Sequence, residues 1–123
     1  MQPEIRVRVY ALDNELRAWV VDELVLMSPG VTVQAAASIA ALDETQAELF
    51  IVGVDALSLA EAQQLREVLD RRRAPVIAIG APGAALAGAA FTAVLDGAVT
   101  SKQFKRAVRE ALGLGVAAPA VHA

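Results

Sequence analysis

The chain has 123 residues, enough for one domain with a single hydrophobic core. Hydrophobic residues make up 56% of it, charged residues 20% and aromatic residues only 4%, which predicts a folded domain with an aliphatic core. A net charge of −3 gives no general attraction to nucleic acid or anionic lipid, and the lack of cysteine excludes disulfides and thiolate metal sites. With no signal-peptide core at the start and no run of about 18 apolar residues, we expect a cytoplasmic protein without membrane insertion.

Short β-branched runs alternate with stretches of helical periodicity along the first part of the chain. Residues 5–11 predict a strand with one partly exposed face, and residues 14–28 predict a helix with Asp13 as its N-cap. Residues 31–36 predict a second strand, and residues 38–45 predict a short, weak helix.

The middle of the chain continues this alternation. Residues 49–54 are apolar at every position, as expected for a central parallel strand with both faces buried. Ser58 and Glu61 form a capping box that opens the next helix. Residues 76–79 predict the fourth strand, and residues 80–90 predict a loop followed by a short alanine-rich helix.

The last part of the chain predicts a weaker fifth strand over residues 91–95 and a final helix that Thr100 and Gln103 open as a second capping box. The domain is expected to span residues 1–114, with residues 115–123 as a flexible tail or linker. Basic side chains lie on the outer side of the final helix: Lys102, Lys105, Arg106 and Arg109.

Five strands alternating with five helices predict an α/β fold, a single doubly wound five-stranded parallel sheet covered on both faces. Chemistry in such a sheet takes place beyond the carboxyl ends of the strands. Those segments contain no histidine, cysteine or tyrosine, and the only histidine, His122, lies near the chain end, which excludes a nucleophilic triad. Residues 83–88 have the glycine spacing of a P-loop, but Ala89 and Ala90 stand where lysine and serine or threonine are required.

Three acidic residues could gather at this edge and bind a divalent cation: Asp13, Glu15 and Asp55. Each also has a simpler role, as an N-cap, a first-turn acid and a loop residue respectively. We therefore expect no catalytic residue, no metal and no cofactor.

Three segments resemble the receiver domain of bacterial response regulators: VYALDNELRAW, LFIVGVDAL and LDGAVTSKQFKRAVREAL. The resemblance covers roughly residues 4–114 and implies a flavodoxin-like (βα)5 fold and a role in two-component signal transduction. In this family two acids after the first strand hold magnesium, and an aspartate at the end of the third strand accepts a phosphoryl group. A hydroxyl after the fourth strand and a lysine after the fifth complete the site.

An alignment without gaps places Leu12 and Asp13 at the two acids, Gly53 at the acceptor, Gly80 at the hydroxyl and Gly97 at the lysine. Four of the five groups are missing, so the resemblance implies a degenerate member, a pseudo-receiver that is not an enzyme.

Asp55, two residues beyond the acceptor position, is the alternative phosphoacceptor, but we expect it to be only a loop residue. The expected function is a phosphorylation-independent interaction or dimerisation module that regulates an attached or partner kinase, ATPase or DNA-binding domain. The basic side of the final helix is either its docking face, for a signalling partner or a second copy, or an ordinary solvated surface. The alternatives are a domain that senses a nucleotide or metabolite in the vacated pocket, and a receiver-like localisation domain of a pilus-assembly ATPase.

Overall fold

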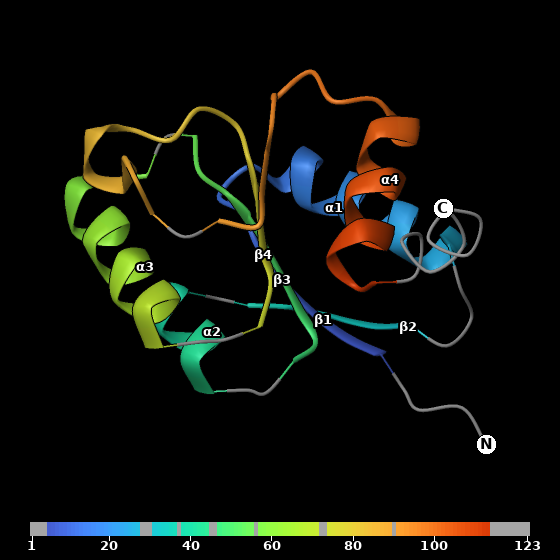
Figure 1. Ribbon diagram of the computed structural model, residues 1–123, viewed down its shortest axis with the longest axis horizontal. Coiled ribbons are helices and arrows are strands. Elements are labelled where there is room, and N and C mark those ends of the chain that lie inside the picture. Colours follow the sequence, from blue (N-terminus) through green and yellow to red (C-terminus); the bar gives the residue numbers. More distant parts are fainter. Residues whose placement is uncertain are drawn as a thin grey trace, which may run out of the picture.

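The computed structural model describes residues 5–27, 31–36, 38–44, 47–55, 57–71, 74–89 and 91–113. Five strands form one sheet in the order β2-β1-β3-β4-β5, and every neighbouring pair runs parallel (Figure 1). The predicted fold class is therefore confirmed. The strands are β1 (Ile5–Tyr10), β2 (Val31–Ala35), β3 (Leu49–Gly53), β4 (Val76–Ile79) and β5 (Ala93–Leu95).

Helices cover both faces of the sheet, with α1 (Asn14–Met27) and α4 (Ser101–Ala111) on one side and α2 (Ile39–Glu44) and α3 (Leu59–Arg71) on the other (Figure 1). Successive residues of a strand point to opposite faces, so each central strand supplies both cores. In β3, for example, Ile51 joins the core under α1 and α4, whereas Val52 joins the core under α2 and α3. All five residues of β3 are buried, as the continuous apolar run predicts.

The predicted helix starts are confirmed by their hydrogen bonds. The Glu61 N–H donates to Ser58 Oγ at 3.1 Å, and the Ser58 N–H donates to Glu61 Oε1 at 3.0 Å, which closes the capping box of α3. Thr100 and Gln103 form the same reciprocal pair at the start of α4. These bonds satisfy backbone donors that the first helical turn leaves without a partner.

The prediction of a short alanine-rich helix within residues 80–90 is wrong. The structure has only a single 3-10 turn there, η1 (Ala84–Leu86). Gly83 supplies no side-chain cap, and Gly88 has a φ of +75°, which interrupts a helix. Arg66 of α3 donates from Nη1 to the carbonyl oxygens of residues 85 and 87 at 3.2 and 2.9 Å, so these carbonyls have a partner outside any helix.

The fifth strand is shorter than predicted, because β5 begins at Ala93 and not at residue 91. Phe91 instead packs as a partly buried side chain against the core under α2 and α3. Thr92 lies just before the strand, where its Oγ1 accepts from the Val76 N–H at 3.1 Å. The predicted tail at residues 115–123, with His122, lies outside the described residues.

Phe104 of α4 is fully buried and meets Trp19 of α1 edge to face, with 5.2 Å between the ring centroids. We predict that Phe104→Ala lowers the free energy of unfolding by about 3–5 kcal/mol, because it removes a large buried side chain and leaves a cavity. The matched control is Leu59→Ala, at a residue 66% exposed, which should change stability by about 0.5 kcal/mol or less. Urea unfolding measures both, and similar losses would contradict the packing described.

The hydrogen bond from the Tyr10 hydroxyl to Glu61 Oε2, 2.8 Å long, makes stability depend on pH. Burial and the neighbouring Glu61 raise the pKa of Tyr10 from 10.0 to about 12, so its contribution is complete below pH 10 and is lost as the pH rises through 12. The Ser58 N–H and then the Tyr10 hydroxyl hold the pKa of Glu61 below 4.5, so its contribution is present above that pH and is lost below it.

We predict that Tyr10→Phe removes the alkaline loss that Tyr10 causes and reduces the acid loss without abolishing it, because Ser58 still donates to Glu61. The measurement is the difference in unfolding free energy between wild type and variant from about pH 3 to pH 11, since other titrating groups cancel in that difference. A difference that does not change with pH would contradict this prediction.

Candidate functional site

The loops at the carboxyl ends of the strands form the candidate site. After β1, Asp13 caps α1, because its Oδ1 accepts from the backbone N–H groups of Glu15 at 2.8 Å and Leu16 at 3.3 Å. Glu15 lies in the first turn of the same helix. Both acids therefore have the local roles that the sequence predicts, and Leu12 beside them is 49% exposed.

Gly53, at the end of β3, is closely packed by its neighbours. A Cβ atom built on Gly53 would lie 3.1 Å from Ala11 Cβ and 3.1 Å from Leu16 Cδ2. These apolar atoms belong to the residue after β1 and to the first turn of α1, and they would have to shift by a few tenths of an ångström to admit a Cβ atom.

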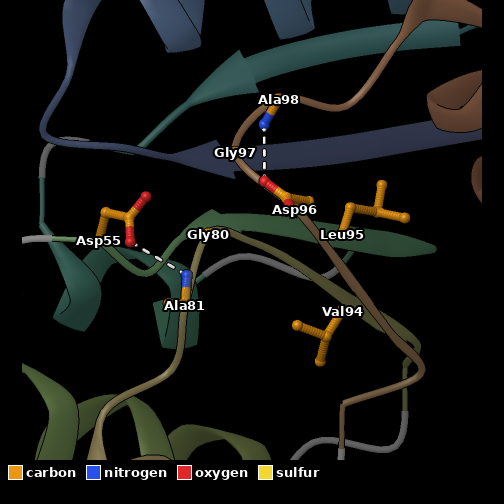
Figure 2. Close-up of a pocket in the computed structure, with 8 residues that line it drawn as sticks. All are labelled: Asp55, Gly80, Ala81, Val94, Leu95, Asp96, Gly97 and Ala98. Atoms are coloured by element: carbon orange, nitrogen blue, oxygen red, sulfur yellow. Dashed lines mark hydrogen bonds between the residues drawn. The ribbon is translucent and has the colours of Figure 1, made fainter.

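Asp55 lies in the turn after β3, as predicted, but it reaches across to the next loop. Its Oδ1 accepts from the Ala81 N–H at 3.0 Å (Figure 2). A Cβ atom built on Gly80 would lie only 2.6 Å from Asp55 Oδ2, and one built on Gly97 would lie 3.6 Å from the same oxygen. The carboxylate of Asp55 thus lies close to Gly80 and Gly97, the glycines that the alignment assigns to the hydroxyl and lysine positions of a receiver.

Gly80 is the residue that this arrangement requires to be glycine. Its φ is +114°, a conformation that residues with a side chain rarely adopt, and its N–H donates to the Leu95 carbonyl at 2.8 Å. The absence of a Cβ also leaves the space that the Asp55 carboxylate occupies. The backbone conformation of residue 80 and its contact with the Asp55 carboxylate therefore both require glycine.

A cavity of about 320 Å³ opens beside this contact (Figure 2). It contains two carboxylates, those of Asp55 and Asp96, together with small and aliphatic residues. The Oδ1 of Asp96 accepts from the Ala98 N–H at 2.9 Å, so this carboxylate is engaged in its own turn. The lining residues are Asp55, Gly80, Ala81, Val94, Leu95, Asp96, Gly97 and Ala98, none of which is basic.

A second cavity, of about 410 Å³, lies at the start of α1 and shares Gly97 with the first. Asp13 and Glu15 line this second cavity, whereas Asp55 lines the first, so the structure does not gather the three acids into one group. Within the ranges that the structure describes, no three histidine, cysteine or acidic side chains are placed to hold a metal ion together. The magnesium site that the resemblance attributes to working receivers therefore does not fit these residues.

The basic residues of α4 lie as predicted on its outer side, but two of them have partners within the chain. Lys105 Nζ is 3.8 Å from Glu23 Oε1 of α1, and its side chain is 32% exposed. Arg106 Nε is 3.5 Å from Glu110 Oε2 on the same helix. Lys102 and Arg109 are exposed. Among the helices of the described residues, none has the length and apolar character needed to cross a bilayer.

Sequence reasoning found the positions of this site but missed its main contact. The alternation of residues along a strand places Asp55 and Gly53 on the same side, and nothing in that pattern indicates that the Asp55 carboxylate turns toward β4. The sequence signal for this contact is the glycine at residue 80, at the end of the fourth strand, since it leaves space that a neighbouring acid can fill. The filling of the space beside Gly53 by Leu16 has no sequence signal that we can identify.

We predict that Gly80→Ala lowers the free energy of unfolding by about 1–3 kcal/mol, because the added Cβ strains the backbone and meets the Asp55 carboxylate. The cost should be smaller in an Asp55→Ala background, where only the backbone strain remains. The matched control is Gly83→Ala, at a glycine with a φ of −79° and no atom within 4 Å of a built Cβ, which should be tolerated. Equal costs of Gly80→Ala in both backgrounds would contradict the contact.

No protein-family model matches this sequence, and the search of curated proteins finds no match either. Solved structures, however, resemble the chain over most of its length. A CheY-like receiver domain protein from Methanospirillum hungatei JF-1 has a TM-score of 0.74 and 15% identity, with 89% of this chain and 94% of that chain covered.

Two further structures are similar. The N-terminal domain of a response regulator/sensory box/GGDEF protein from Carboxydothermus hydrogenoformans has a TM-score of 0.67 and 14% identity, covering 91% of this chain and 97% of that chain. The receiver domain of a sensor histidine kinase from Pseudomonas aeruginosa PAO1, solved with magnesium in its active-site cleft, has a TM-score of 0.62 and 18% identity, covering 89% and 98%. At this level of identity the likeness concerns the fold, and this chain has the flavodoxin-like fold of CheY-like response-regulator receiver domains.

Proposed function

We propose that this chain is a phosphorylation-independent receiver-like domain that acts as an interaction or dimerisation module in bacterial signal transduction. The observation that carries the proposal is the packing at Gly53. The chain has glycine where a working receiver has its acceptor, and Ala11 and Leu16 lie so close that a side chain at residue 53 would require them to shift. In this proposal the domain has no catalytic residue and regulates an attached or partner kinase, ATPase or DNA-binding domain.

The position of Asp55 supports the same proposal. One of its carboxylate oxygens is bound to the Ala81 N–H, and the carboxylate lies against Gly80, where a sensing hydroxyl would stand. Gly97 provides no ammonium group to neutralise a transferred phosphoryl group. The carboxylate of Asp96 lines the same cavity, and its negative charge would disfavour a dianion attached to Asp55.

The surfaces away from this edge support an interaction role. The outer side of α4 presents Lys102 and Arg109 to solvent, and exposed charged side chains on a receiver-like helix are suited to steering a charged partner. The alternative of a sensing domain would use the 320 Å³ cavity, which is at the small end of the range for ligand sites. Its two carboxylates and lack of basic residues make it poorly suited to a nucleotide. The localisation domain of a pilus-assembly ATPase is compatible with the same fold and the same interaction role.

We predict that a small phosphodonor with magnesium leaves the mass of the protein unchanged. Beryllofluoride with magnesium should likewise leave its melting temperature and oligomeric state unchanged, because Gly80 and Gly97 offer no hydroxyl or ammonium group to bind this phosphoryl analogue. Intact-mass spectrometry and thermal unfolding measure these outcomes, with a receiver domain that accepts phosphoryl groups as the positive control. A gain of one phosphoryl group that Asp55→Asn abolishes would overturn the proposal and identify Asp55 as the acceptor.

A further inference from the structure

Helix α1 carries two large apolar residues on its exposed side. Val20 and Leu24 are buried against the sheet, as expected for a covering helix, but Val25 and Leu26 on the last turns are 57% and 74% exposed. Large apolar residues exposed next to each other mark a surface suited to contact with another protein. Other strongly exposed large apolar residues in the described part of the chain lie singly on other elements: Leu12, Leu59 and Val94.

The two helices on this face of the sheet are held together as one unit. The carboxylate of Glu23 on α1 accepts from Ser101 Oγ at 2.5 Å and lies 3.8 Å from Lys105 Nζ, both on α4. Trp19 and Phe104 add an aromatic contact between the same helices. The surface that α1 and α4 present is therefore rigid and in a fixed orientation.

These two helices carry opposite charge. Of the ionisable residues in the sequence of α1, three are acidic and one is basic, whereas α4 has four basic and one acidic. Asp22 on α1 and Arg109 on α4 are both exposed. An acidic, partly apolar helix thus lies beside a basic helix on one face of the domain (Figure 1).

We propose that this face is covered by a second copy of the chain, related by a two-fold axis that places α1 of each protomer against α4 of the other. In such an interface the same surface patch meets itself, and two complementary contacts form for each dimer. Acidic α1 would then face basic α4 twice, and Val25 and Leu26 would be removed from water. This inference rests on the proposed interaction role and names the partner for it.

Charge complementarity favours a second copy over other partners. An acidic protein or a nucleic acid would be attracted to α4 but repelled by Glu15 and Asp22, the exposed acids of the neighbouring α1. A basic partner would have the opposite difficulty. A second copy in two-fold arrangement supplies both signs in the required places.

Two charge reversals test the arrangement, Asp22→Lys on α1 and Arg109→Glu on α4. Each variant alone should dimerise about tenfold more weakly or worse, because like charges then face each other in both contacts. A mixture of the two variants should recover the dimer as a heterodimer, since each α1 then meets an α4 of opposite charge. Sedimentation equilibrium at low ionic strength measures the dissociation constants, and the mixed species is identified by native mass spectrometry.

The apolar part of the interface has its own test and matched control. Leu26→Asp should abolish the dimer, whereas Leu59→Asp, at a residue 66% exposed on the opposite face, should leave it unchanged. Both positions are exposed, so thermal unfolding should show folded proteins in each case.

A wild-type protein that remains monomeric, a variant mixture that does not recover dimer, or equal effects of Leu26→Asp and Leu59→Asp would each overturn this inference. None of these outcomes bears on the phosphodonor experiment. Conversely, phosphorylation of Asp55 would overturn the proposed function while the two-fold dimer could still be measured, so the two failures are distinguishable.

Discussion

The carboxyl edge of the sheet depends on one hydrogen bond, from the Ala81 N–H to Asp55 Oδ1. It joins the loops that follow the two central strands, β3 and β4, and it places a negative charge directly against the backbone of Gly80. The conformation of Gly80 and the small residues around the cavity are compatible with this bond because none of them projects a side chain into its path. The edge around Gly80 is thus organised by backbone conformation and by the carboxylate of Asp55.

The same domain shows a contrast between this edge and the helical layer formed by α1 and α4. At the edge, glycines stand at the ends of β3 and β4 and after β5, and the hydrogen bonds described there join carboxylates to backbone N–H groups. Between α1 and α4, by comparison, Glu23 binds both a hydroxyl and an ammonium group, and two aromatic rings meet. Side-chain contacts therefore join the two helices that we propose for self-association, whereas at the edge of the sheet the carboxylates bind backbone.

Periodicity and capping signals were sufficient to predict the fold. The alternation of strands and helices, the capping boxes at Ser58 and Thr100 and the buried run of β3 follow from local pattern and are present in the structure. The segment before β5 was predicted less well, because long-range contacts take part in its conformation: Arg66 of α3 binds the carbonyl oxygens of residues 85 and 87. For the site, residue identity indicates which groups are missing, but the direction of the Asp55 side chain depends on tertiary contacts that no local pattern encodes.

The close packing beside Gly53 and Gly80 also limits which substitutions the domain can accept in succession. An acidic side chain introduced at residue 53 meets Ala11 and Leu16, and a hydroxyl-bearing side chain introduced at residue 80 meets Asp55. A side chain at residue 80 therefore costs stability unless Asp55 changes as well, and one at residue 53 requires Ala11 or Leu16 to shift. The substitutions that these two glycines tolerate are thus coupled to the residues beside them, so that paired replacements should be accepted where single ones are not.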